Sequence, residues 1–417
     1  MPAIQVFEHE KLTIHNDEFG RSIASNQLEK LCQFNDNNDN KYFTIIRNGV
    51  KFSQYVGVIQ IGNLTIEILP KADKKKIENK HSLDNTSATW RKVLLKMLSV
   101  CGEIKVDAVS EASLRRRNNS LLDLYFEIFI KEVDLLIRKG LVKKYHSSSG
   151  NVKALKGRLN FSKNIQQNLV HKERFYTHHQ CYDYEHLLNQ ILLKGLYILS
   201  TFSYNPILLD KIDKLRFGFP EIEEILINRS SFDKIILERR TEGYKEAVKI
   251  AKMLILNYSP DISKGQENML ALLFDMNDLW EKYIFKMMKK GENDIFTVDY
   301  QQNQAFWNKR RVKPDIVMER EGETYIIDTK WKIISPDKPS DDDLKQMYVY
   351  NMYWDAPKSM LLYPKNDNKE DGKYGEFHKG REIDKENKCK VGFLNVLNQN
   401  HELNKNIVSD ILEKIDG

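Results

Sequence analysis

The stretch Val312–Trp331 constrains the fold of this chain more than any other part of the sequence. Apolar and β-branched residues stand on both sides of a polar turn, Glu319–Glu323, in which Glu321 and Gly322 are the favoured turn pair. This pattern predicts a two-stranded antiparallel hairpin. A loop formed by this turn pair fixes which residues face each other across the two strands.

The predicted register places Asp315 directly across from Asp328, and strand alternation puts Lys330 on the same face. Two opposed carboxylates weaken a sheet, so another group must offset their repulsion. Hard oxygen ligands on adjacent strands can hold Mg²⁺ and leave positions for water and a phosphate oxygen. Lys330 would then lie beside the metal, where it can position the attacking water and offset phosphate charge. The alternative is a surface hairpin without chemistry.

Two predicted helices flank the hairpin. Downstream, Ser340–Asp343 has the pattern of a helix start, and Gln346 and Tyr350, four residues apart, share one face of the helix that follows. Upstream, Asn277–Lys290 has the apolar periodicity of a helix, with Glu281 at the margin of its apolar face. The simpler interpretations are tyrosines that pack on the sheet and a solvated glutamate.

The spacing of Pro314-Asp315 and Asp328-Thr329-Lys330 resembles the PD-(D/E)xK nuclease motif, and Gln346 with Tyr350 resembles the Q-x-x-x-Y element of many such nucleases. In that superfamily a further metal-site acid often comes from the helix before the hairpin. The resemblance therefore implies an Mg²⁺-dependent site with the metal ligands Asp315, Asp328 and Glu281 and the catalytic residues Asp315, Asp328, Lys330, Gln346 and Tyr350.

Three further stretches narrow the resemblance to the McrC family, the nuclease subunit of McrBC modification-dependent restriction systems. They are Gly62–Lys71, Lys156–Phe161, and Arg174–Tyr176 followed by Leu188–Leu192. With the hairpin they run in order from about residue 57 to about residue 355. Four such matches in the right order make coincidence improbable.

The family resemblance implies a DNA endonuclease subunit that docks on a hexameric AAA+ GTPase, McrB-like, which recognises modified double-stranded DNA. The sequence contains no G-x-x-x-x-G-K-[ST] loop, so we expect GTP hydrolysis to belong to the partner. The resemblance places the docking surface in the N-terminal domain. Two alternatives stay open: an activating subunit with an idle nuclease site, and a nuclease paired with a sequence-specific partner.

The predicted fold class is α+β and multidomain. We expect a β-rich, partner-docking N-terminal domain in residues 1–150, because short β-type runs alternate with turn signals up to about residue 70. Residues 151–265 are predicted to be a helical middle region, and residues 266–417 an α/β PD-(D/E)xK core in which a mixed sheet is flanked by helices. The closing helix is predicted over Ile407–Ile415.

Four polar segments are predicted to lie at the surface. Gln33–Lys41 has little to bury, and Ser147–Gly150 has the composition of a linker. The lysine-rich Lys71–Asn85 is interpreted as a solvated loop or as a contact to phosphate or to a partner. Arg115–Arg117 is interpreted as a solvated run or as a grip on a backbone or on a partner's acidic surface.

Charge and cysteine content exclude several classes of protein. The 65 Lys and Arg against 59 Asp and Glu leave a net charge of only +6, so affinity for DNA must come from local patches or from a partner. Four dispersed cysteines argue against a zinc or disulfide framework. His178 and His179 precede Cys181 closely, but adjacent residues of an extended segment point to opposite sides, which disfavours a metal site there.

The absence of a signal peptide or a long apolar run predicts a cytoplasmic protein without membrane spans.

Overall fold

The computed structural model describes residues 3–72, 79–103, 121–259, 268–334, 339–365, 370–377 and 387–416. The chain forms two compact units. Unit 1 consists of residue 1 and residues 60–63 and 107–272, and unit 2 of residues 2–59, 64–106 and 273–417. Arg115–Arg117 and part of the lysine-rich segment lie outside the described residues. The predicted domain boundaries at residues 150 and 265 remain predictions.

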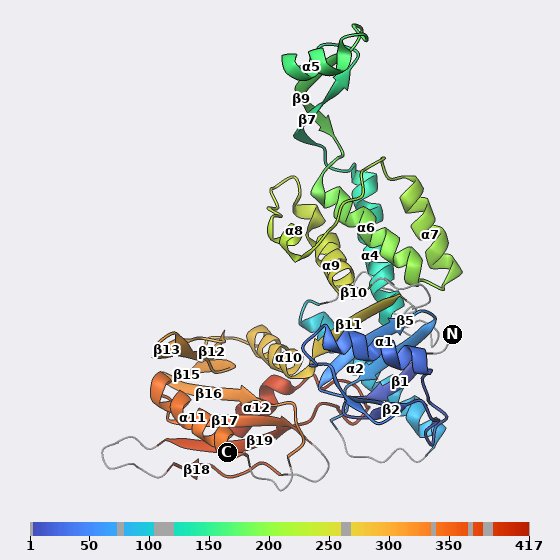
Figure 1. Cartoon of the computed structure of the whole chain (residues 1–417). Coiled ribbons are helices and arrows are strands. Elements are labelled where there is room, and N and C mark those ends of the chain that lie inside the picture. The colour runs from blue at the N-terminus through green and yellow to red at the C-terminus, as the bar shows by residue number, and fades with distance from the viewer. Residues whose placement is uncertain are drawn as a thin grey trace. The chain divides into compact units, whose positions relative to one another are not determined.

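The first seventy residues are rich in strands, as predicted (Figure 1). The elements up to residue 100 are β1 (Ile4–Phe7), β2 (Lys11–Thr13), α1 (Ser25–Asp36), β3 (Phe43–Ile46), β4 (Gly49–Phe52), β5 (Tyr55–Ile61), β6 (Leu64–Leu69) and α2 (Lys80–Val100). One sheet has the order β2-β4-β3, and another the order β1-β6-β5-β11-β10, in which β10 is Tyr258–Ser259 and β11 is Met269–Asp275. Strands β1 and β6 are parallel neighbours.

The predicted surface loop Gln33–Lys41 is wrong at its beginning, because α1 extends to Asp36. Asn35 is only 1% exposed. Its side-chain amide donates to the carbonyl oxygen of Phe43 at 2.7 Å and accepts from the backbone N–H of Tyr42 at 3.2 Å. A buried polar side chain that is satisfied in this way belongs to a core, although its residue type is typical of loops.

Unit 1 has a helical core, as the sequence predicted for most of the middle region. The elements are α4 (Leu121–Lys139), β7 (Lys144–Val152), β8 (Arg158–Leu159), α5 (Phe161–Asn168), β9 (Phe175–Asp183), α6 (Leu187–Phe202), α7 (Pro206–Phe217), α8 (Arg229–Asp233), a 3-10 helix (Glu242–Tyr244) and α9 (Lys245–Leu256). Helices α4, α6, α7 and α9 pack together around apolar side chains.

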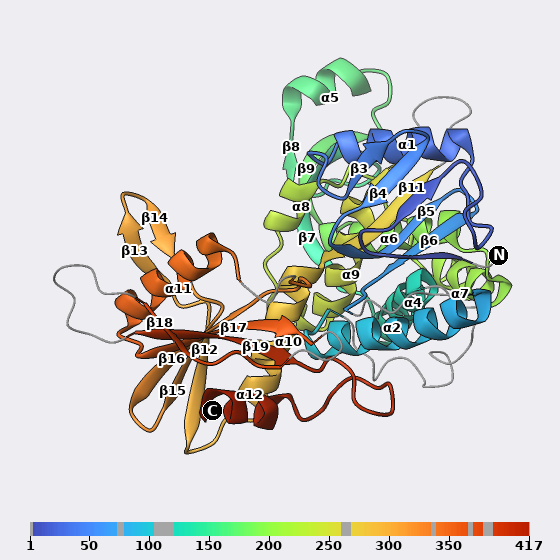
Figure 2. The ribbon, with the colours of Figure 1, turned by 90° about the horizontal axis from the view of Figure 1, so that it is seen from below.

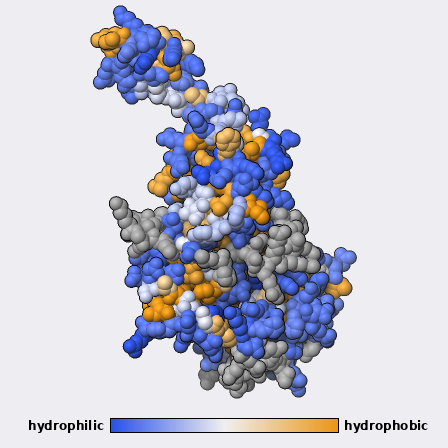
Figure 3. All heavy atoms as spheres, turned by 90° about the vertical axis from the view of Figure 1, so that its right-hand side faces the viewer, coloured by the Kyte–Doolittle hydropathy of each residue, from blue (hydrophilic) through white to orange (hydrophobic). Residues whose placement is uncertain are grey.

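Residues 144–183, which we call the arm, correct the prediction of an all-helical middle region. Strand β7 pairs with β9 from Lys144 opposite Asp183 to Val152 opposite Phe175, so the predicted linker Ser147–Gly150 is part of a long strand. Serine and glycine have low strand propensity, but continuous cross-strand pairing overrides it. Figure 3 shows apolar surface at the end of the arm, where the exposed side chains include Phe161, Ile165, Leu169 and Val170.

The motif Lys156–Phe161 turns the chain at the end of the arm. Gly157 has φ +61°, and a Cβ there would lie 2.3 Å from the carbonyl oxygen of His178. Only glycine fits this close approach of two backbones. Asn160 then begins α5, since its side chain accepts a hydrogen bond from the backbone N–H of Lys163 at 3.1 Å.

The C-terminal part of unit 2 contains a six-stranded sheet of order β12-β15-β16-β17-β19-β18. The strands are β12 (Phe296–Tyr300), β15 (Ile316–Arg320), β16 (Glu323–Thr329), β17 (Lys358–Pro364), β18 (Gly375–Glu376) and β19 (Lys388–Leu394). The helices are α10 (Met276–Lys290), α11 (Asp341–Trp354) and α12 (Ile407–Asp416), and β13 (Gln304–Trp307) with β14 (Arg310–Val312) forms a separate hairpin. The predicted helices and strands of this region are confirmed.

The sheet is covered on both faces (Figure 2). Helix α11 packs on the face that carries Val317, Ile326 and Tyr363, while α10 and α12 pack against each other on the other side. Strand β16 lies in the middle, so Ile326 and Ile327, which point to opposite faces, are both fully buried. Central strands of this kind give the side chains at their ends little freedom. No helix within the described ranges is long and apolar enough to cross a membrane.

Candidate active site

The hairpin β15–β16 has the predicted register. Glu321 and Gly322 form its turn with φ values of +53° and +83°, and Val317 pairs with Ile326 as expected. Positive φ at both turn residues is the type I′ geometry whose twist matches that of the strands. The ladder runs to Ile316, so the next residue on that strand, Asp315, stands at the level of Asp328.

Asp315 is half-buried and held by the opposite strand. One carboxylate oxygen accepts hydrogen bonds from the backbone N–H of Thr329 at 2.7 Å and from its hydroxyl at 3.0 Å. Burial, followed by the charges of Asp328 and Glu281, nevertheless raises the pKa of Asp315 to about 8. The raised pKa means that the site repels a further negative charge and favours a cation or a proton.

Asp328 and Lys330 form the inner pair of the site. Asp328 is 1% exposed, and Nζ of Lys330 lies 2.8 Å from its Oδ2. Burial raises the pKa of Asp328 despite the opposing effect of Lys330. Burial alone would lower the pKa of Lys330, but Asp328 and its acidic neighbours raise it above its ordinary value. The lysine is therefore charged and directed into the carboxylate cluster.

Gln346 and Tyr350 connect α11 to this pair. Gln346 accepts a hydrogen bond from Nζ of Lys330 at 3.3 Å and donates one to the Tyr350 hydroxyl at 2.7 Å. The hydroxyl in turn donates to the carbonyl oxygen of Lys313 at 2.9 Å, two residues before Asp315. The two side chains share a helix face as expected. Together they link Lys330 to the chain segment that carries Asp315.

Glu281 approaches the cluster from α10. Its Oε1 accepts a hydrogen bond from Nε2 of Gln301 at 2.5 Å, and the backbone N–H of Gln301 donates to the carbonyl oxygen of Asp315 at 3.0 Å. The pKa of Glu281 is raised, because the effect of burial exceeds the opposing effect of the hydrogen bonds from Gln301 and Tyr300. The structure thus brings all six of the site residues selected from the sequence to one end of the sheet.

Comparison with known proteins identifies the family. The family described as McrBC 5-methylcytosine restriction system component matches residues 50–364, which is three quarters of the chain. The chain belongs to this family. The resemblance inferred from the sequence motifs is thereby confirmed.

Two relatives extend the comparison. The Type IV methyl-directed restriction enzyme EcoKMcrBC of Escherichia coli K12 is 21% identical over 230 residues, 51% of this McrBC-family chain and 65% of the relative. A chain from the half-complex of a tetradecameric assembly of Thermococcus gammatolerans McrB AAA+ hexamers with bound McrC aligns over 99% of both chains, with a TM-score of 0.69 and 20% identity. This second likeness shows a shared fold.

Asp343 is a site neighbour that the sequence reasoning missed. Its Oδ1 lies 3.9 Å from Nζ of Lys330, and its Oδ2 lies 2.7 Å from Nζ of Lys332 and 3.4 Å from the Tyr363 hydroxyl. The sequence reasoning had treated this residue only as part of the helix start. Its position three residues before Gln346, on the same helix face, was the signal that could have revealed it.

Glu8 is the second neighbour that was missed. This buried carboxylate accepts hydrogen bonds from the Trp331 indole N–H at 2.7 Å and from the backbone N–H of Lys71 at 2.9 Å. Burial raises the pKa of Glu8 to about 7. Trp331 follows Lys330 directly, so the residue after β1 fixes the chain beside this lysine. No local pattern could reveal a contact between residues 323 positions apart.

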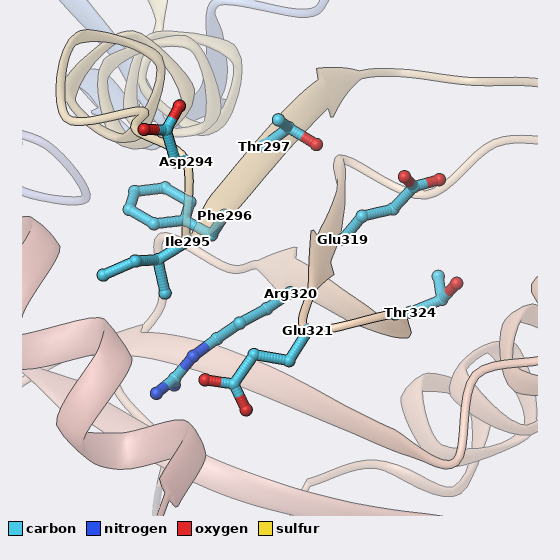
Figure 4. A pocket seen from close by; sticks show the side chains of 9 residues that line it. Asp294, Ile295, Phe296, Thr297, Glu319, Arg320, Glu321 and Thr324 are labelled. Carbon is cyan, nitrogen blue, oxygen red and sulfur yellow. The ribbon is translucent and has the colours of Figure 1, made fainter.

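A cavity of about 360 Å³ lies elsewhere on the same sheet. Figure 4 shows it at the turn end of the hairpin, between Phe296, Arg320 and Glu321. None of its lining residues belongs to the carboxylate cluster, which sits at the opposite end of β15 and β16. The cavity is therefore separate from the candidate active site.

The carboxylate cluster fits a divalent metal ion. Asp315, Asp328 and Glu281 supply hard oxygen donors, which Mg²⁺ prefers. Burial, followed by repulsion from Asp328 and Glu281, raises the pKa of Asp315, and a divalent cation would remove that repulsion. The ammonium group of Lys330, which contacts Asp328, offsets only part of the negative charge.

Proposed function

We propose that this protein is an Mg²⁺-dependent DNA endonuclease of the PD-(D/E)xK type and the cleaving subunit of an McrBC-like restriction complex. The observation that carries the proposal is the pair formed by the half-buried Asp315 and the buried Asp328, with Lys330 on the same face of a hairpin. Acids and a lysine that converge at one end of a central strand are suited to phosphodiester hydrolysis.

Asp315, Asp328 and Glu281 would hold the metal. When bound, Mg²⁺ supplies Lewis-acid stabilisation of the charge that develops on the phosphate. Asp328 is the most buried of the three acids, on a strand whose two faces are both covered. Asp315 is oriented by two donors from Thr329. Both acids are thus fixed before substrate arrives, which lowers the cost of reorganisation during the reaction.

Lys330 would position the attacking water and balance the negative charge of the phosphate. Its Nζ is held between Asp328 and Gln346, so the ammonium group has one preferred place. Tyr350 fixes Gln346 from the far side. This arrangement supports a role for Gln346 and Tyr350 as positioning residues.

We further infer that the substrate is modified double-stranded DNA and that recognition requires an AAA+ GTPase hexamer. The methyl-directed relative and the McrB-bound chain of the same fold support this inference. The sequence has no phosphate-binding loop of its own, which leaves nucleotide hydrolysis to the partner. A net charge of only +6 also agrees with a subunit that does not capture DNA alone.

The test compares Asp328→Asn with Asp299→Asn. Asp299 is an exposed carboxylate on β12 of the same sheet, so its replacement makes the same chemical change outside the cluster. Methylated and unmethylated plasmids are incubated with each protein, the candidate GTPase from the same genome, GTP and Mg²⁺. We expect the parent and Asp299→Asn to cut only methylated DNA, and Asp328→Asn to lose at least about 100-fold in rate.

Unfolding is measured on all three proteins, because Asp328→Asn must keep the parent's fold for the comparison to count. Cutting that survives in Asp328→Asn would overturn the site assignment. A parent that stimulates GTP hydrolysis but cuts neither plasmid would instead identify an activating subunit. Equal cutting of both plasmids would identify a partner that does not read the modification.

A further inference from the structure

A second set of metal-ligating side chains lies in unit 1, at the foot of the arm. His146 on β7 pairs directly with Cys181 on β9, and Asp183 follows two residues later on the same strand. Ligand atoms of these three side chains all lie within 4.8 Å of one another. All three residues are half-buried. The set crosses between two strands, so no spacing along the sequence could reveal it.

The register of the hairpin explains why the three side chains meet. Directly paired residues lie on the same side of an antiparallel ladder, and so do residues two apart on one strand. The neighbouring pair Tyr145 and Tyr182 occupies the opposite face, with ring centroids 4.6 Å apart. This aromatic contact stabilises the register that places His146 and Cys181 together.

One ring nitrogen of His146 lacks a hydrogen-bond partner among the described residues. Its Nδ1 is shielded from solvent and lies 3.3 Å from Oδ1 of Asp183. That approach lacks hydrogen-bond geometry, and among the described residues Nδ1 has no hydrogen-bond partner. Lys144 stands opposite Asp183 in the ladder, but its Nζ lies 3.8 Å from Oε1 of Glu238. A buried ring nitrogen without a partner beside a thiol and a carboxylate favours a metal ion over a simple ion pair.

We propose that His146, Cys181 and Asp183 bind a zinc ion, with water in the fourth position. Zn²⁺ takes nitrogen at about 2.0 Å, thiolate sulfur at about 2.3 Å and carboxylate oxygen at about 2.0 Å in a tetrahedron. Such ligand atoms are about 3.5 Å apart, so the three side chains need to converge by about 1 Å. Half-buried side chains on a paired ladder can make this adjustment by rotation without moving the strands.

The donor set separates this site from the carboxylate cluster of unit 2. A thiolate and an imidazole favour Zn²⁺ and other late transition metals, whereas Mg²⁺ requires oxygen ligands. On binding, the Cys181 thiol gives its proton to solvent, and the thiolate forms the bond to the metal without change in oxidation state. The ion would join β7 to β9 where the two strands leave the helical core.

The experiment measures metal binding directly and needs no cleavage assay. Untagged full-length protein is stripped of metal, titrated with Co²⁺ as an optical probe, and then with Zn²⁺ in competition with a chromogenic chelator. Cys181→Ser and His146→Ala remove one ligand each. Cys32→Ser is the matched control, because Cys32 is another half-buried free thiol, located on α1.

We expect the parent and Cys32→Ser to bind one equivalent of Zn²⁺ and to show thiolate-to-Co²⁺ charge-transfer absorption. Cys181→Ser should lose that absorption, and both ligand variants should bind Zn²⁺ at least about tenfold more weakly. Zn²⁺ should raise the melting temperature of the parent but not of Cys181→Ser. Unchanged binding by Cys181→Ser, or no Zn²⁺ bound by the parent at micromolar concentration, would overturn the proposal.

Discussion

Carboxylates of the same chemical type have different surroundings within unit 2. Asp315 accepts from the backbone and hydroxyl of Thr329, Asp328 pairs with the ammonium group of Lys330, and Glu8 accepts from an indole and a backbone N–H. Burial is the largest cause of the raised pKa in all three. What differs is the donor: the ammonium group of Lys330 contacts Asp328, whereas neutral N–H and O–H groups donate to Asp315 and Glu8.

The raised pKa of Glu8 makes stability depend on pH. The folded pKa of about 7 lies above the ordinary pKa of 4.5 for a glutamate, so between these pH values the folded chain holds a proton that the unfolded chain has lost. The resulting stabilisation is complete below about pH 4.5 and is lost as pH rises towards 7, by about 3 kcal/mol in total. Glu8→Gln cannot ionise, so its stability relative to the parent should rise between pH 5 and pH 8, by about 2–3 kcal/mol.

Urea unfolding of both proteins across this pH range provides the measurement. The difference between the two unfolding free energies removes the contribution of every other titrating group. If the unfolding free energies of the two proteins changed with pH in parallel, Glu8 would already be ionised in the folded state at low pH. That result would contradict the effect expected from its burial.

At the scale of the element, the sequence predicted those parts of the structure that local pattern determines. The hairpin β15–β16 has a period of two and a turn that requires positive φ, and α11 begins at the cap that Ser340 provides. Strand β7 was missed because its serines carry no apolar periodicity and because its pairing with β9 spans a separate helix. Asp343 and Glu8 were missed because their partners come from other elements.

Helix α11 provides a test of positioning. Tyr350→Phe removes the hydroxyl that joins Gln346 to the Lys313 carbonyl oxygen, and so frees the amide that holds Lys330. We expect cleavage to slow by about tenfold through misplacement of the lysine. We also expect the free energy of unfolding to fall by about 1–2 kcal/mol, because buried polar groups lose their partner.

Tyr348→Phe is the control for this variant. Tyr348 lies on the same helix, where its ring packs against Phe377, and it has no part in the chain of hydrogen bonds to Lys330. Its cleavage rate should match that of the parent. Equal loss of rate in both variants would assign the effect to the stability of α11 and would remove Tyr350 from the positioning role.

At the scale of the molecule, the two ends of the sequence meet in one unit. Residues 2–59 and 273–417 belong to unit 2, and Glu8 reaches Trp331 within it. Removing residues 1–150 to test for a docking surface would therefore also remove β1 and leave the Trp331 indole without its acceptor. The arm can be shortened without this damage, because its strands β7 and β9 are paired along their whole length and can be cut at the same level.

Shortening the arm should leave the rest of the molecule folded. Ser147 pairs with Gln180, so residues 148–179 can be replaced by Asn-Gly in a two-residue turn. We expect the shortened chain to melt within about 3 °C of the parent, since the removed residues lie outside the helical core. Replacing residues 148–180 by the same turn shifts β9 by one position, and this control should be less stable because each side chain changes face. Thermal unfolding followed by circular dichroism gives the melting temperature of each shortened chain. Equal melting temperatures would show that the register of β7 and β9 does not contribute to stability.

The bond between Glu8 and Trp331 has a consequence for the synthesis of this protein. The ribosome releases Glu8 long before Trp331, from which it is separated by 323 residues. During that interval the carboxylate remains hydrated. Strand β17, which is the parallel neighbour of β16, and strand β19, which pairs with β17, have yet to be translated. The nascent chain therefore has no assembled cluster of acids around Lys330. The proposed cleavage activity can therefore arise only after almost all of the chain has left the ribosome.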